Sequence, residues 1–337
     1  MITDIDILYN RHLLSRHQIE THYGSIDEGH VFHSNDIFQT VEAFFQIADA
    51  LQSEKMDFVP LKGPVLSHQI YRDYACRRFY DLDFLVDFDD VERFSRLLVD
   101  LGYQPASAWP ATPYKKEGLR QNCNEVLFQH RRNGTDVEIH WRLFARYRFP
   151  DISFRRLHNE HTIPYALDGR TIRKLSPEME LLFLLIHGAT HAWFRIKWLV
   201  DVNDYIKNVS VDFDALHDMA AKNGFLKMIN YYNAVAEAYI PQACKIPGAN
   251  RAVPKCLTRY TDKEIQELHN KDLRIAVRKS VGYLAEKCLA EIHLAPDSYS
   301  RYRAVKSFLG GALPKNLVRR LEPLDRLWNY VRKNCRK

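Results

Sequence analysis

Two aspartates separated by one residue, Asp81 and Asp83, are the side chains of this sequence best suited to chemistry. The apolar residues around them predict a β-strand, on which alternate side chains point to the same face. Two carboxylates held side by side repel each other unless a cation lies between them. Oxygen ligands of this kind suit Mg²⁺ or Mn²⁺, and Mg²⁺ usually binds through one or two carboxylates and the phosphates of a substrate. The pattern predicts a metal site for nucleotide chemistry; the alternative is two solvated acids at a strand edge.

A glycine turn upstream of these acids is suited to binding phosphate. Residues 58–61 have the composition of a strand, and Lys62-Gly63-Pro64 follows them. Gly63 lets the backbone approach an anion without a Cβ in the way, and Pro64 suits the start of a helix whose N–H groups would face that anion. Lys62 adds a positive charge. We therefore expect Lys62 and Gly63 to bind the phosphates of a nucleotide.

A third acid is expected from a hairpin further along the chain. Residues 124–131 and 136–141 have strand patterns, and Asn133-Gly134 between them is a strong hairpin turn signal. Alternation places Glu138 and His140 on one face of the second strand. The hairpin can therefore bring Glu138 beside the two aspartates.

These motifs, together with others downstream, resemble a known family. The motifs that carry the resemblance are Leu61-Lys62-Gly63, Tyr71, Arg77, Asp81-Leu82-Asp83-Phe84-Leu85-Val86, Glu138-Ile139-His140-Trp141-Arg142-Leu143, Leu175-Ser176-Pro177-Glu178, His187, His191, Trp198 and Asp201. Over about residues 35 to 240 the chain resembles the uncharacterised bacterial nucleotidyltransferase family of the polymerase-β-like superfamily. One departure is that the Gly-Ser turn usual in the superfamily is replaced by Lys62-Gly63-Pro64, so no serine hydroxyl is present there to hold a triphosphate.

The resemblance implies a metal-dependent nucleotidyltransferase. Such an enzyme moves a nucleoside monophosphate from an NTP, with ATP favoured, to an acceptor hydroxyl or phosphate and releases pyrophosphate. Members of the family occur beside polysaccharide and peptide natural-product genes, so the expected acceptor is a small molecule, glycan or peptide of a biosynthetic pathway. The resemblance implies three groups of site residues. The catalytic residues, which also bind two Mg²⁺ or Mn²⁺ ions, are Asp81, Asp83 and Glu138. The nucleotide-binding residues are Lys62, Gly63, Arg77, His191 and Arg195, and the supporting residues are His140, His187 and Asp201.

The expected fold class is α+β, with a small mixed-sheet nucleotidyltransferase palm and an α-helical C-terminal domain. We expect residues 1–34 to form an N-terminal helical extension, residues 35–175 the palm and residues 176–337 the helical domain. The boundary is placed near Leu175 because strand alternation does not reappear beyond it.

The hydrophobic periodicity predicts individual elements. Strand patterns cover residues 58–61, 79–86, 103–106, 124–131, 136–141, 162–166 and 170–175, the last two joined by a turn at Asp168-Gly169. Helical patterns cover residues 36–52, 64–71, 89–101, 177–192, 196–208, 212–222, 225–239, 262–290, 298–309 and 317–334. Residues 108–118 are expected to form a proline-rich loop over the site.

His187 and His191 lie four residues apart on one helix face, a spacing that can bind a metal. The residues between them do not include the glutamate of a zinc protease. Three interpretations stay open: hydrogen-bonded structural histidines, contacts to nucleotide phosphates, and a zinc site. Arg195 lies just beyond and could extend a positive wall for a triphosphate. We expect His191 to face the substrate and His187 to be structural.

The composition restricts which cell compartment and which binding partners we expect for this protein. The six cysteines are widely spaced without a Cys-x-x-Cys pair, the first twenty residues contain charges throughout, and no apolar stretch is long enough to span a membrane. We therefore expect a cytoplasmic protein with free thiols. Residues 315–337 carry eight basic and two acidic side chains, which accounts for the formal net charge of +6. This segment is either a solvated helix face or a surface for an anionic partner.

Two other functions remain as alternatives. The basic C-terminal segment motivates an enzyme or toxin directed at tRNA or other RNA, although nucleic acid is the less favoured partner. A non-catalytic nucleotide-binding module is the other alternative, and the intact acids at positions 81, 83 and 138 argue against it.

Overall fold

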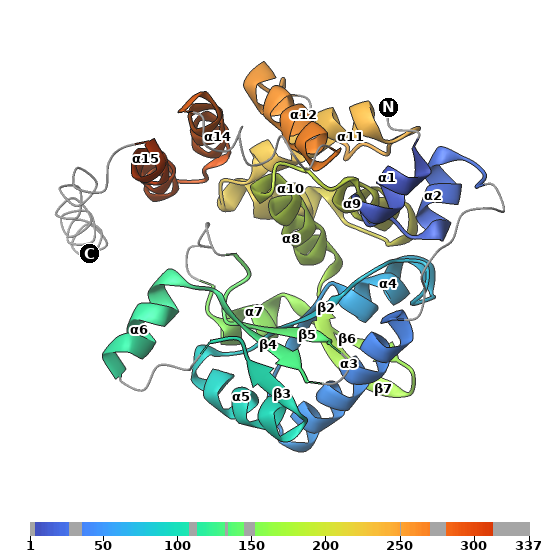
Figure 1. The fold of residues 1–337 in the computed structure, drawn as a ribbon, viewed down its shortest axis with the longest axis vertical. Helices are drawn as coiled ribbons and strands as arrows, with labels where there is room; N and C mark the ends of the chain where they lie inside the picture. The colour runs from blue at the N-terminus through green and yellow to red at the C-terminus, as the bar shows by residue number, and fades with distance from the viewer. Residues whose placement is uncertain are drawn as a thin grey trace.

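The computed structural model describes residues 4–26, 36–107, 113–131, 134–144, 152–249, 251–269 and 281–312. Figure 1 shows two groups of elements, a β-sheet with its helices below and a set of helices above. This is the α+β arrangement that the sequence predicts, with strands in the first half and helices in the second.

Five strands form one mixed sheet in the order β1-β2-β5-β4-β3. Their bounds are Val59–Leu61 for β1, Asp81–Leu85 for β2, Tyr103–Pro105 for β3, Glu125–His130 for β4 and Asp136–His140 for β5. β2 and β5 pair in parallel, with Asp81 opposite Asp136 and Asp83 opposite Glu138, and the other neighbours are antiparallel. The parallel pair therefore aligns two rows of acids across one face of the sheet.

The two faces of this sheet belong to different cores. On one face, Phe84 stacks on Phe44 of α3 (Asp36–Ser53) with ring centroids 5.7 Å apart, and α5 (Val91–Asp100) covers the same core. On the opposite face, which carries the acids, Leu61 and Leu85 join the core of the helical half. Alternation along β2 therefore turns the acidic face toward the upper helices.

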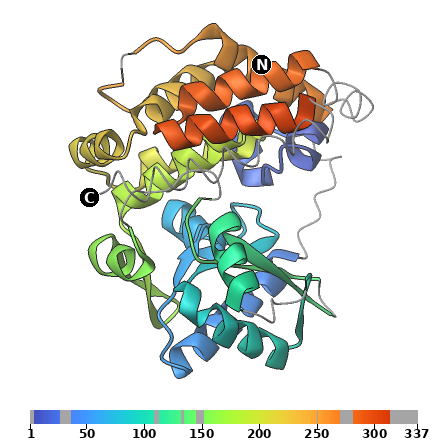
Figure 2. The same ribbon diagram turned by 90° about the vertical axis from the view of Figure 1, so that its left-hand side faces the viewer.

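The helical half begins directly after a two-stranded sheet of β6 (Thr162–Leu167) and β7 (Arg170–Leu175). Asp168 and Gly169 both have positive φ, as the tight turn predicted there requires. Ser176 then caps α8, with Pro177 in its first turn. The helices of this half are α8 (Pro177–Thr190), α9 (Ile196–Asn208), α10 (Phe213–Lys222), α11 (Leu226–Tyr239), α12 (Lys255–His269), α14 (Val281–Leu294) and α15 (Ser298–Ala312). α14 and α15 pack side by side (Figure 2).

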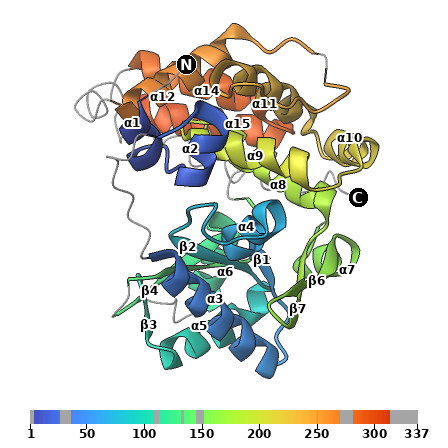
Figure 3. The ribbon, with the colours of Figure 1, turned by 90° about the vertical axis from the view of Figure 1, so that its right-hand side faces the viewer.

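The N-terminal helices, α1 (Ile5–Asn10) and α2 (Arg16–Tyr23), lie against the helical half although they precede the sheet in sequence (Figure 3). Tyr23 Oη donates to the carbonyl of Tyr239 at 3.0 Å, and Leu14 and Ile19 are fully buried in the helical core. The N-terminal segment is therefore part of the same packed body as α8 to α11.

Several predicted elements differ in the structure. Residues 113–118 of the expected loop belong to helix α6 (Pro113–Asn122), whereas 108–112 lie outside the described residues. A short helix that the sequence pattern did not predict, α7 (Phe154–Glu160), precedes β6. A 3-10 turn, η1 (Phe88–Asp90), precedes α5. The stretch 262–290 is covered in part by α12 and α14, and the segments 270–280 and 317–334 lie outside the described residues.

The structure bears on two expectations from the composition, the state of the cysteines and the length of the apolar segments. Five cysteines in this part of the chain, at positions 76, 123, 244, 256 and 288, are free thiols. Within the described ranges, no helix combines the length and the apolar composition needed to cross a membrane.

Candidate metal and nucleotide site

The parallel pairing of β2 and β5 brings three possible metal ligands together. Asp83 lies opposite Glu138, and His140 follows two residues later on the same face. Each residue offers one ligand atom, and these atoms all lie within 4.8 Å of one another. His140 Nε2 is 3.1 Å from Asp83 Oδ1 and 3.2 Å from Glu138 Oε2. The imidazole therefore lies between the two carboxylates.

The surrounding acids favour the protonated form of His140. Burial lowers the pKa of His140, but its hydrogen bonds to Asp83 and Glu138, together with the charges of Asp83 and Glu125, outweigh burial and raise the pKa to about 10. Glu125 Oε2 lies 3.3 Å from His140 Nδ1 on the other side of the ring. The imidazole thus provides positive charge between Asp83 and Glu138, whereas the cation expected between Asp81 and Asp83 stays a prediction.

The two carboxylates of the cluster differ in acidity. Burial raises the pKa of Asp83, but Lys62 and His140 outweigh it and hold that pKa well below its usual range. Lys62 Nζ lies 3.6 Å from Asp83 Oδ2. For Glu138, the hydrogen bond from His140 lowers the pKa, but burial and the charge of Asp83 outweigh this and raise it. Asp83 is therefore the more acidic ligand of the pair.

Asp81 is not part of this close cluster. It is exposed at the start of β2, on the same face as Asp83 and opposite Asp136. Alternate residues of a strand are about 6 to 7 Å apart along the chain, whereas residues opposite each other on neighbouring strands are about 5 Å apart. Distance along the strand therefore explains why Glu138, and not Asp81, lies closest to Asp83.

The turn before helix α4 (Gly63–Tyr71) has an unusual backbone. Lys62 has φ 55° and ψ −128°, a region that residues with a Cβ rarely adopt, and Gly63 follows with φ 50°. Backbone of this kind costs on the order of 1–3 kcal/mol and is found most often at ligand sites. A Cβ on Gly63 would meet only Leu82 Cδ2, at 3.9 Å, so conformation and not space requires glycine here. The Lys62 side chain provides no cap for α4, and its ammonium reaches Asp83 instead.

Arg77 lies inside the protein and not with the residues expected to bind nucleotide. Its side chain is 2% exposed; Nε donates to Asp201 Oδ1 at 2.8 Å and Nη2 donates to Asp201 Oδ2 at 2.9 Å. Burial lowers the pKa of Arg77 and raises that of Asp201, but their mutual attraction outweighs burial for both groups. Arg77 therefore forms a two-bond ion pair with Asp201, and its predicted phosphate contact stays a prediction.

A second buried acid, one turn further along α9, extends this ion pair into a polar cluster that the sequence reasoning did not find. Asp204 accepts a hydrogen bond from Tyr71 Oη and lies 2.7 Å from His22 Nε2. Gln18 Nε2 donates to Tyr71 Oη at 2.9 Å. The sequence contained one indication of this cluster, because aspartates at positions 201 and 204 lie on the same face of a helix. The cluster joins α2, α4 and α9.

The histidine pair lies at the C-terminal end of α8. His187 is half-buried and His191 is exposed, with ring centroids 4.8 Å apart, and Trp198 contacts both at 5.0 and 5.1 Å. Burial and the charge of Lys62 hold the pKa of His187 well below its usual range, so this ring is neutral. In the described part of the chain, no third His, Cys or carboxylate lies close enough to complete a metal site with this pair.

Two cations follow the pair on the next helix. Arg195 precedes α9, and its Cζ lies 5.4 Å from the centroid of Phe194 and 5.8 Å from that of Trp198. Lys197 is buried; burial and the charge of Arg77 lower its pKa to about 7. Arg195 therefore lies against two aromatic rings, and the positive wall for a triphosphate stays a prediction.

A comparison with protein families identifies the fold of this site. The model of a family described as an uncharacterised nucleotidyltransferase matches residues 33–241, which contain the acidic cluster, the glycine turn and the histidine pair. The chain belongs to this nucleotidyltransferase family. No curated protein matches the chain.

Two solved structures are similar to part of this nucleotidyltransferase. One is the crystal structure of a lincosamide antibiotic adenylyltransferase with lincomycin bound, which is 18% identical, with a TM-score of 0.36, over 50% of this chain and 97% of that one. The other is an antigenic nucleotidyltransferase-like protein from Paracoccidioides brasiliensis, which is 16% identical, with a TM-score of 0.34, over 56% of this chain and 88% of that one. At this level of similarity neither structure bears on the substrate of this chain.

Proposed function

We propose that this nucleotidyltransferase is a cytoplasmic, divalent-metal-dependent enzyme. It moves a nucleoside monophosphate from an NTP, with ATP favoured, to a hydroxyl or phosphate of a biosynthetic acceptor and releases pyrophosphate. The observation that carries the proposal is the cluster of Asp83, Glu138 and His140, whose ligand atoms lie within 4.8 Å of one another on the sheet face turned toward the helical half. Asp81, on the same face, is proposed as a further ligand.

The donor set supports Mg²⁺ or Mn²⁺. The carboxylate oxygens of Asp83 and Glu138 are the hard ligands that these ions prefer. The same carboxylates lie close to two basic side chains, Lys62 and His140, and this proximity supports a site for positive charge. Bound ions would lower the pKa of an acceptor hydroxyl and neutralise the leaving pyrophosphate.

The remaining residues of the proposed site act by position and charge. Lys62 and the backbone at Gly63 would bind the triphosphate, because the strained turn presents them at the start of α4. His191 and Arg195 would contact the nucleotide from α8 and α9. His140 would support the metal ligands, because its Nε2 lies within hydrogen-bonding distance of both Asp83 and Glu138.

The test is calorimetric titration with a non-hydrolysable ATP analogue, with and without Mg²⁺. We expect binding to weaken on the order of tenfold or more without the ion, and to weaken similarly in Glu138→Gln. Asp136→Asn is a matched control, because Asp136 is on the same strand face but accepts from Gln129 at 2.9 Å, outside the cluster. Equal affinity of the Glu138→Gln variant and the wild type would exclude the cluster as the metal site.

Two rival functions predict other results. A non-catalytic module would bind the analogue yet release no pyrophosphate from ATP with any acceptor. The RNA-directed alternative depends on residues 315–337, which lie outside the described residues. It predicts RNA binding whose affinity falls steeply with salt, whereas a small-molecule or peptide acceptor predicts none.

A further inference from the structure

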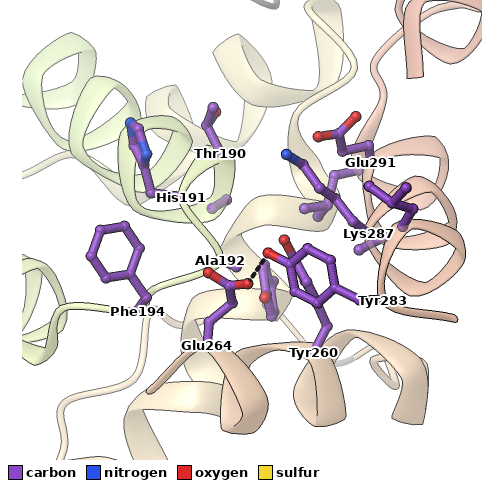
Figure 4. Close-up of a pocket in the computed structure, with 14 residues that line it drawn as sticks. Thr190, His191, Ala192, Phe194, Tyr260, Glu264, Tyr283, Lys287 and Glu291 are labelled. Carbon is purple, nitrogen blue, oxygen red and sulfur yellow. Dashed lines mark hydrogen bonds between the residues drawn. The ribbon is translucent and has the colours of Figure 1, made fainter. Parts of the chain in front are cut away.

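A cavity of about 310 Å³ lies among helices of the helical half (Figure 4), and its described lining includes no residue of the acidic cluster. It is bounded by the C-terminal end of α8 and the loop after it, and by α11, α12 and α14. Binding sites for small molecules have volumes of about 300–1,000 Å³, so this cavity has room for one small compound and not for a polymer.

One histidine links this cavity to the proposed nucleotide site. His191 lines the cavity, and its ring lies 4.8 Å from that of His187. The ring of Phe183 lies 6.2 Å from His187 and 5.6 Å from Lys62 Nζ, which in turn is 3.6 Å from Asp83. A short chain of contacting side chains therefore leads from the cavity to the metal cluster.

The polar lining of the cavity combines aromatic faces with carboxylates. Tyr260 of α12 and Tyr283 of α14 lie with ring centroids 6.0 Å apart, and Tyr283 Oη donates to Glu264 (Figure 4). Among the lining residues that the structure describes, Glu264 and Glu291 are two carboxylates and Lys287 is one ammonium. This balance favours a cationic or neutral ligand over a triphosphate, and tyrosine faces with carboxylate acceptors suit a ring that carries several O–H or N–H donors.

We propose that this cavity binds the acceptor, and that the acceptor is a small polyhydroxylated ring compound in which an amino group is preferred to a carboxylate. The inference rests on the proposed transfer reaction and names the substrate class of that reaction. The acceptor hydroxyl would approach the nucleotide past His191, the residue that the cavity and the proposed nucleotide site share.

The experiment uses three sugars of similar shape and different charge: glucosamine, methyl glucoside and glucuronate. Binding to the full chain is measured by saturation-transfer NMR without metal or nucleotide. We expect glucosamine to bind best, with a Kd on the order of 1 mM, methyl glucoside more weakly and glucuronate least. Absence of binding by all three sugars, or preference for glucuronate, would overturn the proposal.

Two pairs of variants locate the binding. Leu284 lines the cavity and Leu289 of the same helix is 55% exposed outside it, so Leu284→Trp should abolish glucosamine binding and Leu289→Trp should preserve it. Glu264 and Asp262 of α12 each accept from a tyrosine hydroxyl of another helix, but only Glu264 lines the cavity. Glu264→Gln should therefore weaken glucosamine binding about tenfold, and Asp262→Asn should not.

Titration of the same proteins with the Mg²⁺-bound ATP analogue separates this inference from the proposed function. Retention of nucleotide binding in Leu284→Trp shows that the variant is folded and supports an acceptor cavity. Loss of nucleotide binding in Glu264→Gln, with sugar binding unchanged, would assign the cavity to the nucleotide and overturn the inference. A wild-type protein that binds glucosamine but not the nucleotide analogue would refute the metal-dependent function and leave a sugar site.

Discussion

The buried ion pair between Arg77 and Asp201 gives the sharpest prediction about this molecule. Both side chains are 2% exposed, and two hydrogen bonds of 2.8 and 2.9 Å join them. Arg77→Met leaves the Asp201 carboxylate buried without its main partner, which costs about 3–5 kcal/mol in comparable cases. Asp201→Leu leaves the guanidinium in the same position, and we expect a loss of similar size.

The double variant Arg77→Met/Asp201→Leu should be more stable than either single variant. It removes both charges and fills their space with apolar groups, an exchange that is often neutral or stabilising. Lys197, whose pKa burial and the charge of Arg77 lower to about 7, loses both Arg77 and Asp201 as neighbours in the double variant, and these two losses act on its pKa in opposite directions. The three variants therefore form a double-mutant cycle with a large coupling term.

Urea denaturation provides the free energies of unfolding, and titration with the Mg²⁺-bound ATP analogue provides a second observable. If Arg77 acts only through Asp201, the double variant regains nucleotide affinity together with stability. If Arg77 contacts the triphosphate, as the sequence alone suggests, the stable double variant still binds nucleotide poorly. Additive losses of stability in the cycle would refute the reasoning from the ion pair.

Three further predictions follow from single positions. Asp83→Asn should lower the stability of the metal-free protein by about 1–3 kcal/mol, because the buried His140 and the half-buried Lys62 lose a charged partner. An unchanged urea midpoint would contradict this. Gly188→Ala should destabilise the folded protein by about 3 kcal/mol or more, because the added Cβ would lie 2.0 Å from Trp193 Cζ3. Gly118→Ala is the control: no atom lies within 4 Å of the added Cβ, so the thermal midpoint should not fall. Burial lowers the pKa of His12 from 6.5 to about 3, so only the unfolded state gains this proton as the pH falls below 6.5. Stability should fall by up to about 1.4 kcal/mol per pH unit between these values, and His12→Gln should flatten that slope in denaturation curves measured across this range.

The sheet could be predicted because its patterns are local. Alternation along residues 81–86 and 136–141 identifies the buried face of each strand, and a turn signal between residues 131 and 136 sets the hairpin. Those patterns predict that Glu138 can lie near the aspartates, and the structure places it opposite Asp83. The patterns did not predict the position of the His140 ring. That ring lies between the two acids because of the register in which β2 and β5 pair, and alternation along a strand does not determine this register.

The partner of Arg77 could not be predicted, because the choice is made by tertiary packing. Asp73 and Asp81 each lie four residues from Arg77 in sequence, whereas Asp201 lies 124 residues away on α9. The sequence close to Arg77 therefore favoured a role for this residue beside Asp81 and Asp83. The strained conformation of Lys62 could not be predicted either, because a Lys-Gly pair suggests a positive φ at the glycine alone. The structure has positive φ at both residues.

The N-terminal segment makes contacts across the domain boundary that the sequence predicts near residue 34. The family model begins at residue 33, and the sequence pattern treats residues 1–34 as an extension. Yet Gln18 and His22 reach α4 and α9 through Tyr71 and Asp204, and Ser15 Oγ donates to the carbonyl of Cys76 at 2.6 Å. That carbonyl is adjacent to Arg77, which leads into the strand that carries the candidate metal ligands. Residues of α2 therefore help to fix the approach to β2, and the structural unit that supports the site includes residues that precede the family match.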